Sequence, residues 1–278
     1  MNCRGKDLIF GERTHIMGVL NVTPDSFSDG GTYLNIDSAV LHAKTMVAEG
    51  ATIIDIGGES SRPGADPVPT DVEINRVIPV IRALVSEQLN VLYSVDTTKA
   101  EVARKAFEAG AHIVNDITAL RGDSVMAHVA AEMDAGVILM HMRGTPRTMQ
   151  NAPKYENVVD EVYASLESWI FCAIESGIAP DRIIIDPGIG FGKTIKQNLQ
   201  ILRQLDVFKR FNKPLLIGTS RKSFIGNLLD LPVTERLEGS LATVCWAIAR
   251  GVDIVRVHDV QASFRAARIT DVLFRENK

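Results

Sequence analysis

The sequence of 278 residues lacks the features on which several large classes of protein depend. Its three cysteines, Cys3, Cys172 and Cys245, lie far apart and form no CxxC or Cys/His metal pattern. No run approaches the roughly 18 apolar residues that cross a membrane, and the first residues hold no apolar segment typical of a secretion signal. Lysine and arginine number 30 against 34 acidic residues, so there is no cationic surplus for binding nucleic acid. These absences favour a cytoplasmic protein with reduced thiols that binds neither membranes nor nucleic acid.

What the sequence does contain is a regular alternation of two kinds of segment. Hydrophobic residues make up 46% of the chain, enough for one large core. Short β-branched runs predict strands at 15–21, 52–56, 91–95, 112–116, 137–141, 183–186, 214–218 and 254–258. Amphipathic stretches predict helices at 36–49, 72–88, 99–109, 124–134, 156–176, 197–205, 235–250 and 260–274. Thr70-x-x-Glu73 has the pattern of a capping box at the start of the second helix.

Strands that alternate with helices predict right-handed βαβ units and a parallel sheet buried on both faces. At about 35 residues per unit, the size fits a (β/α)8 TIM barrel. No linker or change of composition divides residues 1–278, so we expect a single α/β domain. A doubly wound open sheet is the alternative, because the number of strands alone does not close a sheet.

Polar residues gather where the predicted strands end, which is where parallel α/β proteins build their sites. A single polar residue at such a place is more often a cap or a turn former than a ligand. Here all the strand ends carry one or more: Asn21, Glu59, Asp96, Thr97, Asn115, Asp116, His141, Asp186, Ser220, Arg221, Lys222, Arg256 and His258. Their convergence predicts a functional site at one rim of the sheet.

The connection after the first strand, residues 21–31, is long for a βα loop. It carries Asn21, Asp25 and Asp29, whose oxygen atoms suit Mg²⁺. Gly30 and Gly31 would let it move as a lid. The alternative is a simple turn built from Pro, Asp and Gly.

Cationic residues at three strand ends predict a phosphate site. Arg62 follows the second strand and is held by Pro63, and a guanidinium there can clamp phosphate oxygens. Lys222, Arg256 and His258 follow the last two strands, the usual place for phosphate in barrels. Arg256 and His258 are two residues apart on one strand and therefore point the same way. The alternatives are a solvated surface role for Arg62 and a structural role for His258.

Two carboxylates and an amide at other strand ends suit a flat heterocycle. Asp96, Asn115 and Asp186 can accept hydrogen bonds from the ring N–H and amino groups of an aminopyrimidine-like ring. The same residues are also compatible with helix N-caps, and Asp55, inside its strand, with a structural buried carboxylate.

A glycine-rich loop at 187–194 resembles a nucleotide-binding loop without being one. Pro187 stands where the first glycine of a Walker A motif belongs, and the glycine spacing is not that of a dinucleotide fingerprint. Neither ATP nor NAD is therefore predicted. We expect the loop to present Phe191 as an apolar wall, with Met140 and Met142 as further pocket wall and His141 undecided.

Eight motifs resemble those of bacterial dihydropteroate synthases, in the same order and over nearly the whole chain. They are GVLNVTPDSFSDGG at 18–31, DIGGESSRPG at 55–64, SVDT at 94–97, NDI at 115–117, LMHM at 139–142, DPGIGFGK at 186–193, SRKS at 220–223 and RVHD at 256–259. The resemblance implies a TIM barrel, a homodimer and a folate-biosynthetic transferase that is the target of sulfonamides. Its reaction joins 6-hydroxymethyl-7,8-dihydropterin pyrophosphate to p-aminobenzoate with Mg²⁺, giving 7,8-dihydropteroate and pyrophosphate.

The resemblance also implies roles for individual residues. The pterin would be held by Asp96, Asn115, Met140, Asp186, Gly218 and Lys222, and the pyrophosphate by Asn21, Arg62, Arg256 and His258. The p-aminobenzoate would lie among Phe27, Ser61, Pro63, Phe191, Lys222 and Ser223, and Mg²⁺ would be bound by Asn21 and Asp25. Catalysis would be carried by Asp96, Lys222, Asp25 and Arg62. Ser61 replaces the more usual Thr and Thr219 the more usual Met, which bears on substrate and drug affinity.

This chemistry predicts a cation-like pterin methylene stabilised by Asp96, with no strong general base for the arylamine. Closure of the first two loops over the pyrophosphate would form the p-aminobenzoate pocket, so we expect ordered binding. Two rival functions remain: a pterin-binding methyltransferase acting on a corrinoid protein, and a non-catalytic pterin-binding protein. The methyltransferase has no use for Asn21, Arg62, Arg256 and His258 as magnesium and phosphate ligands. Asp25, Arg62 and Lys222 argue against the non-catalytic protein, because binding alone requires no leaving-group clamp.

Overall fold

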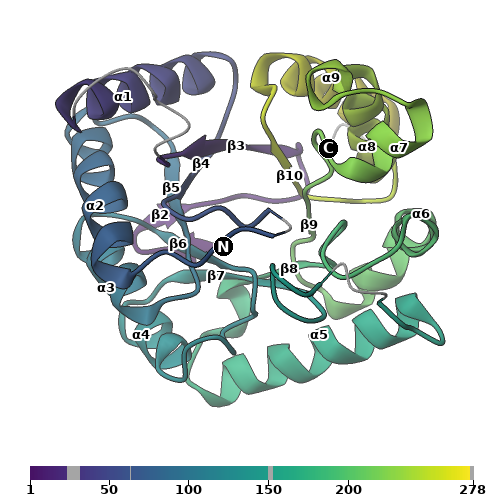
Figure 1. The fold of residues 1–278 in the computed structure, drawn as a ribbon, viewed down its shortest axis with the longest axis horizontal. Coiled ribbons are helices and arrows are strands. Elements are labelled where there is room, and N and C mark those ends of the chain that lie inside the picture. The colour runs from purple at the N-terminus through teal and green to yellow at the C-terminus, as the bar shows by residue number, and fades with distance from the viewer. Residues whose placement is uncertain (24–31, 63, 150–152, 276–278) are drawn as a thin grey trace.

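A computed structural model describes residues 1–23, 32–62, 64–149 and 153–275 of the chain. Eight parallel strands lie in the order β8-β7-β6-β5-β4-β3-β10-β9. A parallel bridge between Ile185 and Leu215 joins the two ends of this order, so the sheet closes on itself. The barrel is therefore the (β/α)8 TIM barrel that the sequence predicts, and the open sheet is excluded (Figure 1). The strands are β3 (His15–Asn21), β4 (Ile53–Gly57), β5 (Leu92–Asp96), β6 (Ile113–Asp116), β7 (Gly136–Met140), β8 (Ile183–Asp186), β9 (Leu216–Ile217) and β10 (Ile254–Val257).

The helices form an outer ring around these strands (Figure 1). The predicted ones are α1 (Thr32–Ala48), α2 (Thr70–Ser86), α3 (Ala100–Glu108), α4 (Met126–Glu132), α5 (Val158–Glu175), α6 (Ile195–Arg203), α8 (Leu237–Ala249) and α9 (Val260–Phe274). A short helix, α7 (Ser223–Leu229), and 3-10 turns at Pro180–Arg182, Leu205–Phe211 and Val233–Glu235 were not predicted. None of the helices in the described ranges has both the length and the hydropathy that crossing a bilayer requires.

The capping box predicted at the start of α2 is wrong. Pro69 precedes the helix, and no side chain caps its first turn. Glu73 instead turns inward, where it is completely buried and accepts a hydrogen bond from Lys99 Nζ at 2.5 Å. The reciprocal capping box lies at α6, between Thr194 and Gln197.

Two apolar layers hold the barrel together. The larger one fills the space between the strands and the helices, because both faces of a parallel sheet are covered. The smaller one lies at the amino-terminal end of the strands, where each strand contributes one large apolar residue: Met17, Ile53, Leu92, Ile113, Ile138, Ile184, Leu216 and Ile254. Cys3 and Leu8 cover this layer from a hairpin of β1 (Asn2–Cys3) and β2 (Lys6–Asp7), whose strands are too short to leave a periodic signal.

Candidate active site

The inward direction of the site residues follows from strand periodicity. Side chains two residues apart on a strand share a face, so the residues two and four positions after the apolar layer also point into the barrel. On β5 this places Ser94 and Asp96 above Leu92, and on β10 it places Arg256 above Ile254. The same count gives Asp55, Asn115, Met140, Asp186 and Gly218 on the other strands. Apolar side chains thus fill the amino-terminal half of the barrel, and polar ones face its carboxyl-terminal mouth.

Arg256 is the centre of this polar layer. Its Nε donates to Asp55 Oδ2 and its Nη2 to Asp96 Oδ2, both at 2.7 Å. Asn115 Nδ2 donates to the same Asp55 oxygen at 3.1 Å. Burial raises the pKa of Asp96 to about 7, although Arg256 opposes the rise, and neighbouring carboxylates including Asp55 add to it. The guanidinium therefore links the predicted site residue Asp96 to Asp55, for which the sequence also allowed a structural role.

Asp186 and Lys222 form a second charged group at the mouth. Asp186 is buried, and its Oδ1 accepts from the backbone N–H of Gly188 at 2.7 Å. Burial lowers the pKa of Lys222 to about 8, while Asp186 raises it and Arg256 lowers it further. Burial likewise raises the pKa of Asp186, and Lys222 is the first group to oppose this. Lys222 Nζ donates to the carbonyl of Ile189. The two side chains thus face the same charged centre as Arg256.

An apolar wall stands beside these charges. Met140, Met142, Met149 and Ile117 pack together, and Phe191 lies against them. Lys222 Nζ lies 4.5 Å from the centroid of the Phe191 ring, a cation–π distance. The predicted contribution of Met140, Met142 and Phe191 to a common apolar surface agrees with this cluster.

The remaining cationic residues differ in exposure. His258 Nδ1 lies 3.1 Å from Ser220 Oγ, and burial together with Arg256 and Arg221 lowers its pKa to about 4. His258 is therefore neutral at pH 7 in the unliganded protein, in contrast to the positive charge expected from the sequence. Arg62 is exposed on the loop after β4. Arg221 is committed elsewhere, because its Nε and Nη2 both pair with Asp259.

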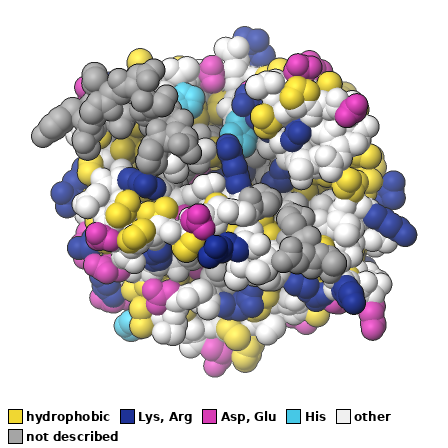
Figure 2. Space-filling model, viewed as in Figure 1, with side chains coloured by type: hydrophobic (Ala, Val, Ile, Leu, Met, Phe, Trp, Pro, Cys, Tyr) yellow, Lys and Arg dark blue, Asp and Glu magenta, His cyan; other side chains and the backbone are white. Residues whose placement is uncertain are grey.

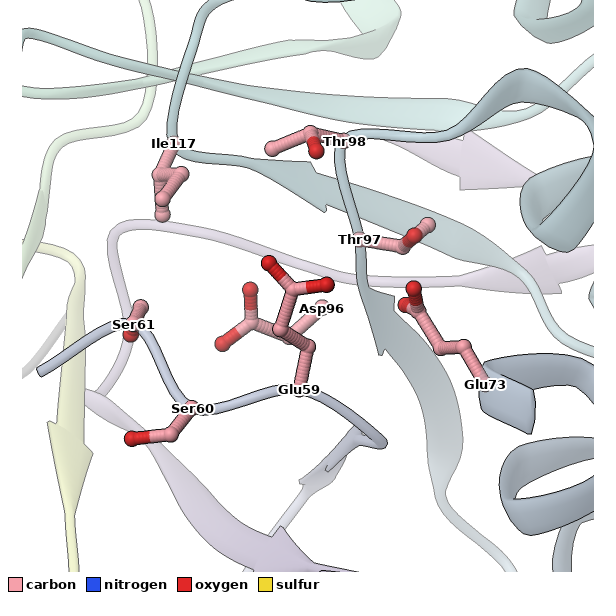
Figure 3. A pocket seen from close by; sticks show the side chains of 8 residues that line it. All are labelled: Glu59, Ser60, Ser61, Glu73, Asp96, Thr97, Thr98 and Ile117. Carbon is pink, nitrogen blue, oxygen red and sulfur yellow. The ribbon is translucent and has the colours of Figure 1, made fainter. Parts of the chain in front are cut away.

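A pocket beside Asp96 was not predicted from the sequence. It is lined by Glu59, Ser60, Ser61, Glu73, Asp96, Thr97, Thr98 and Ile117 (Figure 3). The Asp96 and Glu59 carboxylates lie close together in it, and Glu73 faces them from α2 (Figure 3). Lys99 Nζ donates to both Glu59 and Glu73, which ties the loop after β4 to α2 and α3. The sequence indicated Glu73 and Lys99 only as parts of helix starts, so it gave no signal for their pairing.

The remaining predicted residues make local contacts, are partly or fully exposed, or fall outside the described residues. Asp116 is buried and accepts from Thr118 and Leu120, so it shapes its own turn. His141 is buried, and its ring stacks on Trp169 at 5.4 Å between ring centroids. Ser223 is exposed at the start of α7, and Asn21 is half-buried at the end of β3. The predictions for Asp25, Phe27, Asp29, Gly30, Gly31 and Pro63 lie outside the described residues.

The space-filling view agrees with a mixed-charge mouth. Lys and Arg side chains and a histidine gather around a hollow near the middle of the molecule (Figure 2). Among the described residues no group of three or more His, Cys, Asp or Glu side chains has the arrangement of a metal site. The arrangement can accept hydrogen bonds from a polar ring through its carboxylates and can attract an anion through its guanidinium and ammonium groups.

Comparisons with known proteins agree with this geometry. Residues 17–258 match the family model described as pterin binding enzyme. A dihydropteroate synthase of Synechocystis is 51% identical over 267 residues, 96% of this chain and 92% of that protein. The structure of the Yersinia pestis dihydropteroate synthase with a sulfonamide drug is 43% identical, with a TM-score of 0.92 and 98% of each chain covered. The Xanthomonas albilineans enzyme in complex with 7,8-dihydropteroate is 41% identical, with a TM-score of 0.85 and 95% of each chain covered. The chain therefore belongs to the dihydropteroate synthase family of pterin-binding transferases.

Proposed function

We propose that the mouth of the barrel joins 6-hydroxymethyl-7,8-dihydropterin pyrophosphate to p-aminobenzoate, as the family assignment implies. The observation that carries this proposal is the linkage of Asp55 and Asp96 through Arg256 beside Asp186 and Lys222. It supplies acceptors for a polar ring next to cations for a departing anion. Relatives with a bound sulfonamide and with bound 7,8-dihydropteroate support the same choice of substrates.

The pterin ring is assigned to the inner polar layer. Asp186 and Asn115 would hydrogen-bond its edge, and Asp96 would lie near the reacting methylene. Met140 packs in the apolar wall that would cover one face of the ring. Gly218 borders Arg256, since a Cβ there would lie 3.7 Å from Arg256 Cβ. A ring without these donors would leave buried carboxylates unpaired, which is how such a site discriminates.

The pyrophosphate is assigned to Asn21, Arg62, Arg256 and His258. Arg62 is exposed and therefore accessible, whereas Arg256 would exchange part of its pairing with Asp96 for the phosphate oxygens. His258 is neutral and would gain a proton, or donate from its neutral form, when the anion arrives. A phosphate dianion stabilises the charged imidazole, so its binding would raise the pKa of His258.

The donors at this place also fit Mg²⁺. The half-buried side-chain amide of Asn21 makes no hydrogen bond within the described part of the chain, and Mg²⁺ commonly takes one or two protein oxygens together with substrate phosphates. Asp25 would be the second protein ligand. When bound, Mg²⁺ would neutralise charge on the departing pyrophosphate.

The p-aminobenzoate is assigned to the side of the mouth where Phe191 and Lys222 meet. Phe191 would provide an apolar face, and the Lys222 ammonium would lie above it. Ser61 lines the pocket next to Asp96. Ser223, Phe27 and Pro63 complete the assignment carried by the family resemblance.

The reaction follows from these positions. The bond between the pterin methylene and the pyrophosphate oxygen breaks, and its electron pair leaves with the pyrophosphate while Arg256 stabilises the developing charge. The methylene is left cation-like, and the Asp96 carboxylate stabilises it. The p-aminobenzoate nitrogen then donates its lone pair to form the C–N bond and loses a proton to solvent. Ordered addition, with pyrophosphate before p-aminobenzoate, is part of this proposal.

The decisive experiment mixes the purified protein with both substrates and Mg²⁺ and measures dihydropteroate and pyrophosphate together. Equal amounts of the two products are expected, and omission of p-aminobenzoate should abolish both. Binding of the pterin without pyrophosphate release would favour a non-catalytic pterin-binding protein. Methyl transfer to a corrinoid protein without use of p-aminobenzoate would favour the methyltransferase.

We further propose that residues 1–278 act as one domain and that the protein is a cytoplasmic homodimer. Three free cysteines support a reducing compartment. Four apolar side chains are exposed at the end of α9, which is where a partner copy would pack: Ile269, Val272, Leu273 and Phe274. Sedimentation should give a dimer, and Leu273→Asp should shift it towards the monomer. A monomeric wild-type protein would contradict the assignment.

A further inference from the structure

Lys193 holds a buried side-chain amino group in an unusual setting. Only 2% of the residue is exposed, and no carboxylate of the described residues lies within ion-pair distance of its Nζ. Instead Nζ donates to the carbonyls of Gly188 at 2.8 Å, Phe191 at 2.9 Å and His141 at 3.2 Å. Three acceptors match the three N–H groups of the charged form and so oppose burial, which lowers the pKa of Lys193 well below its usual value. A buried charge is expensive and is kept only where its hydrogen bonds are satisfied.

The cage gives the glycine-rich loop its shape. Gly188, Gly190 and Gly192 all have positive φ angles, of 68°, 84° and 64°. A Cβ on Gly188 would overlap the carbonyl of His141, so the loop presses directly on the end of β7. Lys193 therefore joins two residues of its own loop to the neighbouring strand from the inside. The resemblance of this loop to a phosphate-binding motif thus has a different explanation, since its lysine folds back into the protein.

The loop in turn positions two groups of the site. Phe191 is carried between the Gly188 and Lys193 anchors, and its ring lies 4.5 Å from Lys222 Nζ. The carbonyl of Ile189 accepts from the same Nζ. On the outer side Asn198 Oδ1 accepts from the backbone N–H of Gly190 at 2.7 Å. The position of the Phe191–Lys222 pair therefore depends on this loop, which Lys193 holds from the inside.

We propose that Lys193 is a positioning residue for the amine-side substrate: its carbonyl cage fixes Phe191 and the Ile189 carbonyl against Lys222. The proposal rests on the assignment of Phe191 and Lys222 to p-aminobenzoate made above. It predicts a larger defect for p-aminobenzoate than for the pterin. The pterin residues Asp96 and Asn115 lie on other strands, although Asp186 does accept a hydrogen bond from Gly188 of this loop. A purely structural lysine would instead affect both substrates and stability alike.

Lys193→Met tests the proposal, with Lys196→Met, at an exposed position of α6, as the matched control. Since small misplacements of a binding group can reduce rates up to about 100-fold, we expect KM for p-aminobenzoate to rise roughly tenfold or more. Affinity for the pterin pyrophosphate, measured by calorimetry, should fall by clearly less than this factor. In a double-mutant cycle, Phe191→Ala should add little in the Lys193→Met background, because Lys193 acts through Phe191.

A second variant guards against failure to fold. Lys193→Ala removes Cγ, Cδ, Cε and Nζ, which n-propylamine can replace as a free cation. Added n-propylamine should lower KM for p-aminobenzoate in Lys193→Ala and leave Lys193→Met, whose side chain fills the space, unchanged. Any one of five results would overturn the proposal. They are equal losses for both substrates, additive effects with Phe191→Ala, an unchanged KM for p-aminobenzoate, no response to the amine, and unfolding of both variants. Failure of the proposed function itself would be recognised separately, as absence of product from the wild-type protein.

Discussion

Arg256 donates from Nη2 to Oδ2 of Asp96 at 2.7 Å, across the mouth of the barrel from one strand to another. The same guanidinium holds Asp55, which is completely buried and has one oxygen, Oδ1, without a hydrogen-bond partner. Burying a carboxylate is unfavourable unless a cation and hydrogen bonds compensate for it. Arg256 thus stabilises the buried carboxylates of the unliganded site as well as any bound anion. Its removal is therefore expected to reduce stability as well as anion binding.

His258→Ala should therefore discriminate between ligands more cleanly than Arg256→Ala. His258 contacts Ser220 and pairs with none of the site carboxylates, so its loss should weaken pterin pyrophosphate by roughly tenfold while sparing the phosphate-free pterin. Arg256→Ala should weaken both and reduce the free energy of unfolding by about 3 kcal/mol, because Asp55 loses its cation. Calorimetry with the two ligands and urea unfolding measure these effects. An equal loss of both ligands in His258→Ala would refute the phosphate assignment.

Asp96 should make stability depend on pH. Its folded pKa is about 7, above the unfolded value, so the folded state binds the proton more tightly. The contribution of Asp96 to stability is then fully present below about pH 4 and is lost as pH rises through about 7. Asp96→Asn cannot titrate, so the wild-type protein should lose at least roughly 1 kcal/mol relative to Asp96→Asn between pH 5 and pH 8. Urea unfolding of both proteins at both pH values separates the titration of Asp96 from the constant effect of the lost ion pair. The prediction is contradicted if the free energies of unfolding of the two proteins change equally with pH.

Asp186→Asn should impair pterin binding. The Asn amide presents two N–H donors where the carboxylate presents only acceptors, so one side of the ring edge would meet a donor. A lost charge-assisted hydrogen bond of this kind is worth about 1.5–3 kcal/mol, or roughly 10- to 100-fold in affinity. Gly188 keeps an acceptor in the variant, because Oδ1 accepts its N–H, so the loop should remain intact. Unchanged affinity for the phosphate-free pterin, measured by calorimetry, would remove Asp186 from the pterin site.

Strand periodicity explains how much of the architecture could be predicted from the sequence. The runs at 15–21 and 183–186 coincide with β3 and β8, and the helix at 260–274 with α9. β-branched residues repeated between amphipathic segments leave few other folds, and polar residues at the strand ends then converge by geometry alone. The short helix α7 and the two-residue strands β1 and β2 are below the length at which a period can be recognised.

The partners of the charged side chains could not be predicted in this way. Asp55 and Arg256 are 201 residues apart in the chain, and nothing local marks them as a pair. Lys193 carried a recognisable motif, but the motif could not show that its ammonium turns away from the site. The local pattern assigned Glu73 to a helix cap. In the structure its carboxylate instead forms an ion pair with Lys99, which lies in another helix region. Local patterns thus identify which residues matter more reliably than they identify what those residues contact.

The Glu73–Lys99 pair should contribute far more to stability than an exposed pair of similar length. Glu73 is completely buried, and one of its oxygens, Oε1, has no hydrogen-bond partner, so Lys99→Met should leave an uncompensated charge and reduce the free energy of unfolding by about 3 kcal/mol. Glu73→Gln in the same background should restore part of this loss, giving a coupling energy of about 1–3 kcal/mol.

The matched control is the Lys44–Glu87 pair, at 2.7 Å with side chains 43% and 35% exposed, where the coupling should be below about 1 kcal/mol. Urea unfolding of the two double-mutant cycles compares them directly. If Lys99 also orders the loop after β4 through Glu59, Lys99→Met should in addition raise KM for p-aminobenzoate, because Ser61 lies two residues further along that loop. Equal coupling in both cycles would show that the buried cluster is no more than an ordinary ion pair, and the loop would then need another anchor.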